Sequence, residues 1–273
     1  MTDREIFSAV AKKLSEKGFE SAEREAKELV FWVTGKRCLL DRDVSSEDAD
    51  KIDEACRRRC QNEPLQYILG EWEFCGLTFS VGRGVLIPRQ DTETVVETAL
   101  KLLKTKTSKK VFDLCAGSGC IGISLEKLGQ AEVILFEKSK QALRFLKKNV
   151  ELNRANAKIV EYDVLNGAEY VEKADMIVSN PPYIRTDVLK TLQLEVQHEP
   201  IMALDGGEDG LLFYKAILSR WKKSLKKNGY MVFEIGFDQA EAVKELCQSE
   251  GFCDVTVVKD FCGHDRAVFG ILG

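Results

Sequence analysis

The chain has 273 residues and a net charge of −4 at pH 7, and its apolar and charged fractions of 44% and 31% are those of a globular protein. Its length favours one large and one small domain. No apolar run reaches the roughly 18 residues of a membrane span, and the first residues are polar, so neither a membrane partner nor a secretory signal is expected. Nine cysteines, scattered and odd in number, indicate reduced thiols and a cytoplasmic location.

Charge and metal-ligand patterns exclude further classes. No part of the chain is a basic domain, so direct nucleic-acid binding is not expected. The run Arg57-Arg58-Arg59 could still touch RNA, but a solvated helix face is the favoured interpretation. Cys56 and Cys60 lie one helical turn apart, yet no other ligands follow at a recognisable spacing, so no metal is expected. His198 and His264 are interpreted as loop structure.

The first part of the chain predicts a small helical unit. Thr2-Asp3-Arg4-Glu5 is a capping box, and apolar residues follow it at helical spacing. Ser21 opens a second helix that Gly35 ends, and Ser45 opens a third. Pro64 then closes the unit. This segment is therefore expected to form a small helical domain of its own.

The next residues change character. Aromatic and aliphatic residues in 66–81 are interrupted by Gly70 and Gly76, which predicts a β-hairpin. Val85-Leu86-Ile87-Pro88-Arg89 is a short apolar segment that proline closes, and it is interpreted as a joint between domains. The predicted division is therefore a helical domain at 1–64, a β-hairpin and linker at 65–90, and a large domain at 91–273.

From Asp91 onward, strands and helices alternate, which predicts an α/β fold with a doubly wound, mostly parallel sheet. The last two strands are joined by a short loop and predict an antiparallel edge hairpin. The expected strands are 110–114, 131–136, 158–162, 175–179, 230–235, 255–258 and 267–271, and the expected helices are 92–103, 121–128, 140–152, 211–226 and 239–249.

Asn180-Pro181-Pro182-Tyr183 is the most informative motif. Two prolines cannot continue a central strand, so the chain must leave the sheet after Ser179. Asn180 is thereby held at the carboxyl end of a strand, where open α/β sheets bind ligands. An amide, carbonyls without competing N–H groups and an aromatic ring could together grip a planar –NH2 group. Taken alone, however, the tetrapeptide is as well explained as a rigid turn.

A second motif follows the first strand of the large domain. Gly117 and Gly119, in the run Asp113 to Cys120, allow the backbone to approach a ligand closely. Such a turn alone could bind a dinucleotide, a phosphate or nothing. Glu137 ends the next strand, where a carboxylate can hold ribose hydroxyls, and Asp163 ends the third, where it could face an adenine edge. Together they predict a nucleoside pocket; because no lysine follows the turn, a triphosphate is disfavoured.

This combination resembles the amino-methyltransferases that use S-adenosylmethionine, and within them the release factor glutamine methyltransferases. The resemblance implies a Rossmann-like class I methyltransferase sheet of order 3-2-1-4-5-7-6 with its last strand antiparallel. It covers nearly the whole chain, but the helices of residues 1–64 match the family's substrate-recognition domain in pattern and length only. The matching segments outside the pocket are Pro64 to Gly70, Phe74-Cys75-Gly76, Leu86 to Arg89 with Thr92-Glu93, His198-Glu199-Pro200, Ala203-Leu204, Gly206 to Leu211, Glu234-Ile235-Gly236, and Asp260 with Gly263, Asp265 and Arg266.

The resemblance implies a reaction, a partner and a set of site residues. The methyl group of S-adenosylmethionine would pass to the side-chain amide nitrogen of the glutamine in the Gly-Gly-Gln motif of class I peptide-chain release factors, leaving S-adenosylhomocysteine. The enzyme is expected to act as a monomer without a metal. The implied residues are Asn180, Pro181 and Tyr183 for catalysis, these with Pro182 and Arg89 for the substrate, and Asp113, Cys115, Ala116, Gly117, Ser118, Gly119, Glu137, Asp163, Val164 and Asn180 for the cofactor.

Two positions depart from the family pattern. Cys115 stands where the family's first turn usually begins with glycine, so its φ must be one that a Cβ permits. Glu137 replaces the more usual aspartate and is one methylene longer. Both changes could lower cofactor affinity without changing the reaction.

Two other functions stay open. A nucleic-acid adenine methyltransferase shares the Asn-Pro-Pro-Tyr tetrad and would use the pocket for a flipped base, but it should show a basic cleft. A catalytically silent, cofactor-binding adaptor of the translation machinery is disfavoured by the intact tetrad. A turnover assay separates the adaptor from the enzymes.

Overall fold

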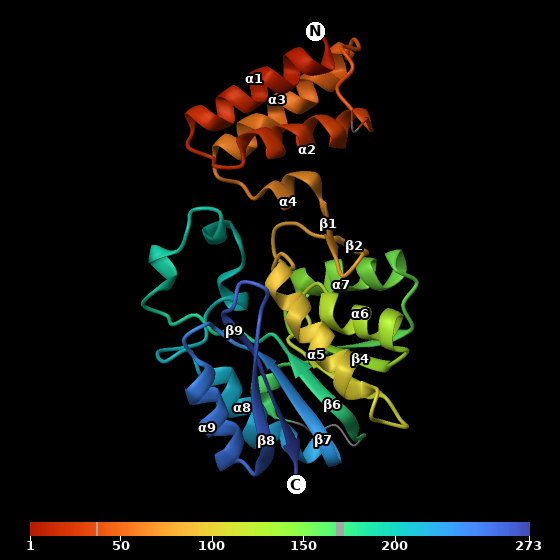
Figure 1. Ribbon diagram of the computed structural model, residues 1–273, viewed down its shortest axis with the longest axis vertical. Coiled ribbons are helices and arrows are strands. Elements are labelled where there is room, and N and C mark those ends of the chain that lie inside the picture. The colour runs from red at the N-terminus through yellow and green to blue at the C-terminus, as the bar shows by residue number, and fades with distance from the viewer. Residues whose placement is uncertain (37, 168–171) are drawn as a thin grey trace. The chain divides into compact units, whose positions relative to one another are not determined.

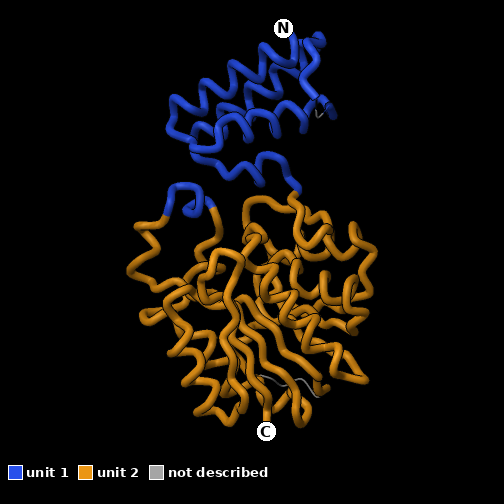
Figure 2. Tube along the Cα trace, in the orientation of Figure 1, with its two compact units in different colours: residues 1–71, 193–198 blue, residues 72–192, 199–273 orange. Residues whose placement is uncertain are grey.

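The structure is a computed structural model that describes residues 1–36, 38–167 and 172–273. Its internal contacts divide the chain into two compact units, shown in Figure 2. The helical unit comprises Met1–Glu71 and Gln193–His198, and the large unit comprises Trp72–Leu192 and Glu199–Gly273. Most of the predicted linker therefore belongs to the large unit. Among the described residues, no helix is both long and apolar enough to cross a membrane.

The helical unit is built on three helices, α1 (Asp3–Glu16), α2 (Ala22–Thr34) and α3 (Ser46–Cys60). The predicted capping box is confirmed, since Thr2 and Glu5 each accept the other's backbone N–H. Gly35 ends α2 in the left-handed conformation, as expected. The apolar faces of the three helices share one core, which includes Ile6, Val10, Leu14, Ala26, Leu29, Ile52 and Cys56.

The interpretation of the arginine run is wrong for Arg59. This side chain is 2% exposed, and its guanidinium donates to Glu25 and to Glu195 Oε1, the latter at 2.6 Å. It also lies over the ring of Phe19, 3.9 Å from the centroid. Arg59 is therefore an internal ion-pair centre, and it attaches residues 193–198 to the helical unit (Figure 2).

A short helix, α4 (Leu65–Leu69), precedes the hairpin, where an extended segment was predicted. Pro64 opens this helix and Gly70 ends it with φ +78°. The hairpin itself is confirmed but shorter, with β1 (Glu71–Phe74) and β2 (Leu77–Ser80). Five residues give too little periodicity to separate a single helical turn from a strand.

The large unit contains the predicted seven-stranded sheet (Figure 1). Its order, β5-β4-β3-β6-β7-β9-β8, corresponds to the expected 3-2-1-4-5-7-6. Strand β9 pairs antiparallel with both neighbours, as predicted from the short final loop. The strands are β3 (Lys110–Leu114), β4 (Glu132–Glu137), β5 (Ala157–Glu161), β6 (Ala174–Ser179), β7 (Leu225–Glu234), β8 (Phe252–Lys259) and β9 (Asp265–Leu272).

Helices cover both faces of this sheet (Figure 1). Alternate strand residues such as Val111 and Phe112 enter opposite cores, because successive side chains of a strand point to opposite faces. One core holds α5 (Glu93–Leu103), α6 (Cys120–Gly129) and α7 (Lys140–Leu152). The other holds α8 (Leu212–Trp221) and α9 (Ala240–Ser249).

The predicted helix 211–226 is too long. Helix α8 ends at Trp221, whose buried indole donates to the Val164 carbonyl at 2.9 Å. After a short 3-10 turn, Leu225 already pairs with Ala174 across the sheet. Strand β7 therefore begins before the predicted turn at Asn228-Gly229, and a register shift near Ala174 accommodates the added residues.

Candidate active site

A cavity lies at the carboxyl ends of β3, β4 and β6 in the large unit. It brings together most of the predicted site residues: Arg89, Cys115, Ala116, Gly117, Ser118, Glu137, Asp163, Val164, Asn180 and Pro182. Asp113, Gly119, Pro181 and Tyr183 are not among the residues that line it. Apolar walls come from residues without a predicted role, among them Leu86, Ile87, Tyr162, Leu165 and Phe213. Such a cavity can hold a flat, partly apolar ligand against a few polar groups.

The glycine-rich turn connects β3 to α6 under steric constraint. Gly119 has φ +82°, and a Cβ there would lie 2.4 Å from Leu146 Cδ1. Cys115 also has a positive φ of +62°, so it adopts the left-handed conformation that glycine adopts more readily. The expected departure is therefore tolerated, because this φ lies within the small left-handed region open to residues with a Cβ.

Asp113 stabilises the glycine-rich turn by a hydrogen bond to the helix that follows it. It is 1% exposed, and its Oδ2 accepts the Gly122 N–H at 2.9 Å. Burial raises the pKa of Asp113 to about 7, although the hydrogen bond from Gly122 acts to lower it. A Cβ at Gly122 would lie 2.3 Å from Leu135 Cδ2 and 2.9 Å from Asp113 Oδ2, so helix and sheet meet here without room for a side chain.

Asn149 in α7 fixes the same turn from the other side. Its buried amide donates to the Ser118 carbonyl at 2.9 Å and to the Ser80 carbonyl at 3.1 Å. Its Oδ1 accepts the Ser80 N–H at 2.6 Å. The amide thus ties the turn to strand β2. We did not predict this role, because an asparagine within a helix gives no local signal of a contact with residue 80.

The two predicted acids, Glu137 and Asp163, have different hydrogen-bond and ion-pair partners. Glu137 accepts the N–H groups of Gly117 at 2.8 Å and Ser139 at 2.6 Å, and burial raises its pKa against these bonds. Asp163 pairs with Lys138 at 2.7 Å and accepts the Leu165 N–H at 3.0 Å. Burial favours the neutral form of Asp163, but these partners outweigh it and lower its pKa. Both carboxylates border the cavity.

The tetrad begins where β6 ends, at Ser179. The Ser179 hydroxyl donates to the Leu114 carbonyl at 2.6 Å, which joins this strand end to the start of the glycine-rich turn. Asn180 and Pro182 line the cavity, and the hydroxyl of the adjacent Tyr183 donates to Glu234. A Cβ at Gly206 would be 2.7 Å from Tyr183 Cα, so only glycine lets the following loop pack on the tetrad.

Glu199 is a functional candidate that the sequence interpretation missed. Its buried carboxylate accepts the Ile87 N–H at 3.0 Å and pairs with Arg89, which lines the cavity. Pro200 and Met202, directly after it, line the cavity too. Glu199 therefore fixes one wall of the site. Only its membership of a family-like motif could have indicated it, since its partners lie more than a hundred residues away.

The thiols in this region are poor nucleophiles. Burial raises the pKa of the Cys115 and Cys120 thiols well above the ordinary range, and nearby carboxylates add to the shift. Both remain protonated at neutral pH, and the thiolate is the reactive form of cysteine. The polar groups that face the cavity can instead orient a ligand by hydrogen bonds.

The sheet order, the glycine-rich turn and the acids after the next two strands together define a Rossmann-like class I methyltransferase. Family models agree, since "Methyltransferase small domain" matches residues 90–202 and "PrmC N-terminal domain" matches residues 5–70. The chain is 41% identical to the release factor glutamine methyltransferase of Clostridium acetobutylicum, over 90% of this chain and 87% of that protein. It is 39% identical to that of Geobacter sulfurreducens, over 100% and 97%. The chain belongs to the release factor glutamine methyltransferases.

Solved structures of lower identity share the fold. The hMettl16 catalytic domain in complex with the MAT2A 3'UTR hairpin 1 has a TM-score of 0.60 at 16% identity, over 84% of this chain and 81% of that one. A methyltransferase from Pyrococcus furiosus has a TM-score of 0.54 at 18% identity, over 73% and 91%. At this identity the likeness concerns the fold alone.

Proposed function

We propose that the protein transfers the methyl group of S-adenosylmethionine to the side-chain amide nitrogen of the Gly-Gly-Gln glutamine in class I peptide-chain release factors, in the cytoplasm. The observation that carries this proposal is the position of Asn180. This residue lines the same cavity as the glycine-rich turn, Glu137 and Asp163. An acceptor for an amide therefore lies beside groups suited to a nucleoside.

The chain's own residues fit this cofactor. Glu137 and Asp163 are carboxylates that can accept hydroxyl and amino hydrogens of a nucleoside, and Phe136, Tyr162 and Leu165 supply apolar walls for its base. The turn at Gly117 allows close backbone approach. When bound, S-adenosylmethionine supplies a methyl group already activated by its sulfonium charge.

Asn180 and Pro181 would prepare the nucleophile. An amide nitrogen is a poor nucleophile because its lone pair is delocalised into the carbonyl group. We assign the Asn180 Oδ1 and the Pro181 carbonyl as acceptors for the two N–H bonds of the substrate amide, with Tyr183 covering its face. Alignment of this kind can contribute roughly 7–11 kcal/mol to a barrier. A strong base is not needed, because the nitrogen becomes acidic once it is methylated.

Partner recognition is assigned to the helical unit and to Arg89. Trp32 is 43% exposed on the helical unit, which gives a folded partner an apolar anchor. A peptide loop needs no basic groove, in keeping with the net charge of −4. The release factor would dock as a folded protein and place its loop in the cavity.

Mass spectrometry tests this function. Purified class I release factor is incubated with the protein and isotope-labelled S-adenosylmethionine, and the peptide that contains Gly-Gly-Gln is sequenced. We expect one labelled methyl group on the glutamine amide. A release factor with glutamate in place of that glutamine is the control and should stay unlabelled.

Two results would overturn the proposal. One is labelling of tRNA or DNA, offered in the same assay, with none on the release factor, which would indicate an adenine methyltransferase. The other is no labelling of any macromolecule despite measurable cofactor binding, which would indicate an adaptor.

A further inference from the structure

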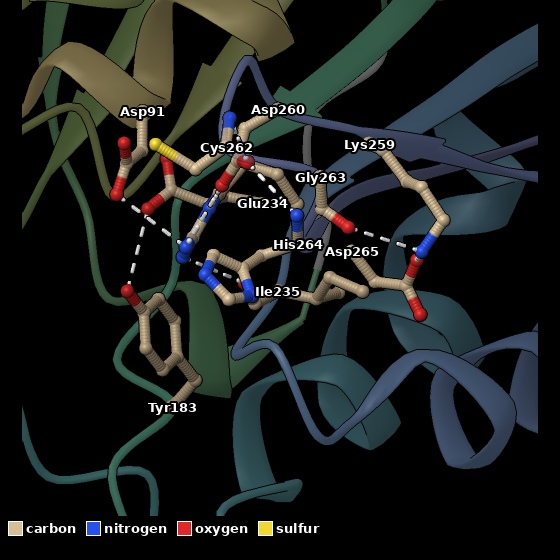
Figure 3. Close-up of polar contacts among 11 residues, drawn as sticks. Asp91, Tyr183, Glu234, Ile235, Lys259, Asp260, Cys262, Gly263, His264 and Asp265 are labelled. Carbon is tan, nitrogen blue, oxygen red and sulfur yellow. Dashed lines mark hydrogen bonds and ion pairs between the residues drawn. The ribbon is translucent and has the colours of Figure 1, made fainter.

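Tyr183, the neighbour of the cavity-lining Pro182, is held at two points. Its hydroxyl donates to Glu234 Oε1 at 3.4 Å, and Figure 3 shows the phenol pointing at that carboxylate. Its backbone carbonyl accepts the Gln239 side-chain amide at 3.0 Å. Gln239 is itself oriented, because its Oε1 accepts the Gly236 N–H at 3.0 Å. The carbonyl contact fixes the main chain, whereas the ring packs against the core and is oriented at its hydroxyl by Glu234.

Glu234 occupies a constrained place. It ends β7, the neighbour of β6, and it is 1% exposed. Its own carbonyl accepts the Tyr214 hydroxyl at 2.9 Å. Thr92, whose hydroxyl approaches the carboxylate, lines the cavity. Glu234 thus lies between the tetrad tyrosine and the cavity wall.

Several elements of the large unit place charged or titratable groups near the Glu234 carboxylate. Arg266 in β9 is a nearby cation, but its guanidinium also binds Asp260 at 3.2 Å and Asp91 at 3.4 Å. Asp91 also acts directly on the carboxylate and raises its pKa, and Tyr183, Tyr214 in α8 and Cys120 in α6 are further titratable groups near it. Burial raises the pKa of Glu234 to about 7, although Thr92, Arg266 and Tyr183 act in the opposite direction. Its charge therefore changes near neutral pH.

We infer that Glu234 is a positioning residue for methyl transfer: its carboxylate accepts the Tyr183 hydroxyl and thereby fixes the tyrosine ring against the substrate amide. This inference rests on the function proposed above. An ionised acceptor forms a stronger hydrogen bond than a neutral one. The turnover number kcat should therefore rise with pH through about 7, the pKa to which burial raises this carboxyl.

A double-mutant cycle tests whether Glu234 acts through Tyr183. The variants are Glu234→Gln, Tyr183→Phe and the double mutant, with kcat and KM measured on a release factor. We expect each single change to lower kcat about tenfold relative to the wild-type protein. The double mutant should also lose only about tenfold, because the effects of two residues that act through one contact do not add. Glu234→Gln should also lose the rise in kcat near pH 7.

Asp175→Asn is the matched control. Asp175 is likewise a buried carboxylate, but it is the second residue of β6, at the opposite end of that strand from Asn180, where it pairs with Lys226 at 2.8 Å. When Asp175→Asn is combined with Tyr183→Phe, the fold-losses in kcat of the two single variants should multiply. Circular dichroism and calorimetric cofactor binding establish that each variant is folded, and Glu234→Asp replaces Glu234→Gln if the latter is not.

The outcomes separate the two proposals. If the wild-type protein methylates the release factor but the double mutant is about a hundredfold slower, the losses are independent and the role of Glu234 is overturned while the function stands. A wild-type rise near pH 7 that persists in Glu234→Gln also overturns it. If the wild-type protein methylates no release factor, the proposed function fails and the role of Glu234 fails with it.

Discussion

Asn180 combines two properties that a single residue seldom has. The prolines that follow restrict its backbone, and the residue lines the cavity. The pairing of Ser179 with Leu114 and with Phe233 holds it from both neighbouring strands. A side chain presented in this way loses little conformational entropy when it binds an amide.

Replacing Asn180 by alanine should therefore abolish most turnover without loss of the fold. We expect kcat to fall at least ~100-fold, equivalent to about 2.7 kcal/mol of barrier. Cofactor affinity, measured by calorimetry, should stay largely unchanged. Near-normal turnover of the variant would contradict the role given to this amide.

Cys115 allows a test of backbone strain. Its φ of +62° is open to glycine and disfavours β-branched residues most strongly. Cys115→Gly should change the free energy of unfolding by less than ~1 kcal/mol, whereas Cys115→Val should lower it by about 2 kcal/mol or more. Denaturant titration measures both. Equal effects of the two substitutions would show that strain at this position is not decisive.

At the scale of elements, Arg59 links α2 (through Glu25), α3 and the segment 193–198. Its removal leaves the carboxylate of Glu25 buried without its charged partner. Arg59→Ala should therefore lower the free energy of unfolding by about 3–5 kcal/mol. Thermal and urea denaturation would measure the loss.

Arg57→Ala is the control for that substitution. Its side chain is 64% exposed, on the same helix, and pairs with Asp53 and Glu54. We expect a change within about 0.5 kcal/mol, as for other surface positions. If the two arginines cost the same, the ion pair of Arg59 does not contribute what its burial implies.

The sequence predicts correctly the bounds of those elements that depend on local apolar periodicity alone. Strand Lys110–Leu114 and helix Lys140–Leu152 have the expected bounds, because apolar periodicity specified them. Helix α8 ends early because Leu225 joins the sheet beside Ala174, which is a long-range pairing. The same limit applies to the site. Asn180 was found from its motif, while Glu199 was missed because its partner Ile87 lies 112 residues away in sequence.

At the scale of the whole molecule, three buried acids with raised pKa values, Asp113, Glu137 and Glu234, set the pH dependence of stability. Burial raises the pKa of Asp113 and of Glu234 to about 7, from 3.8 and 4.5. The folded state therefore holds protons that the unfolded chain has already released. This contribution is complete below about pH 4 and is lost as the pH rises to about 7.

The free energy of unfolding should accordingly fall between about pH 4.5 and 7, by up to ~1.4 kcal/mol per pH unit for each acid. Urea denaturation at several pH values measures this slope, and Asp113→Asn should flatten it. Asp163, Asp175 and Asp260 have lowered pKa values and act only at more acidic pH. Stability that increases steadily towards pH 7 would contradict the prediction.

The helical unit is discontinuous in sequence, since it takes six residues from the middle of the chain. A gene fragment that stops at residue 71 would lack Glu195, the partner of Arg59. A chimaera that exchanges only the amino-terminal region with a relative would combine Arg59 of one parent protein with the segment 193–198 of the other. Transplanting this unit intact requires moving both pieces together, because a cut between residues 71 and 72 separates Arg59 from Glu195.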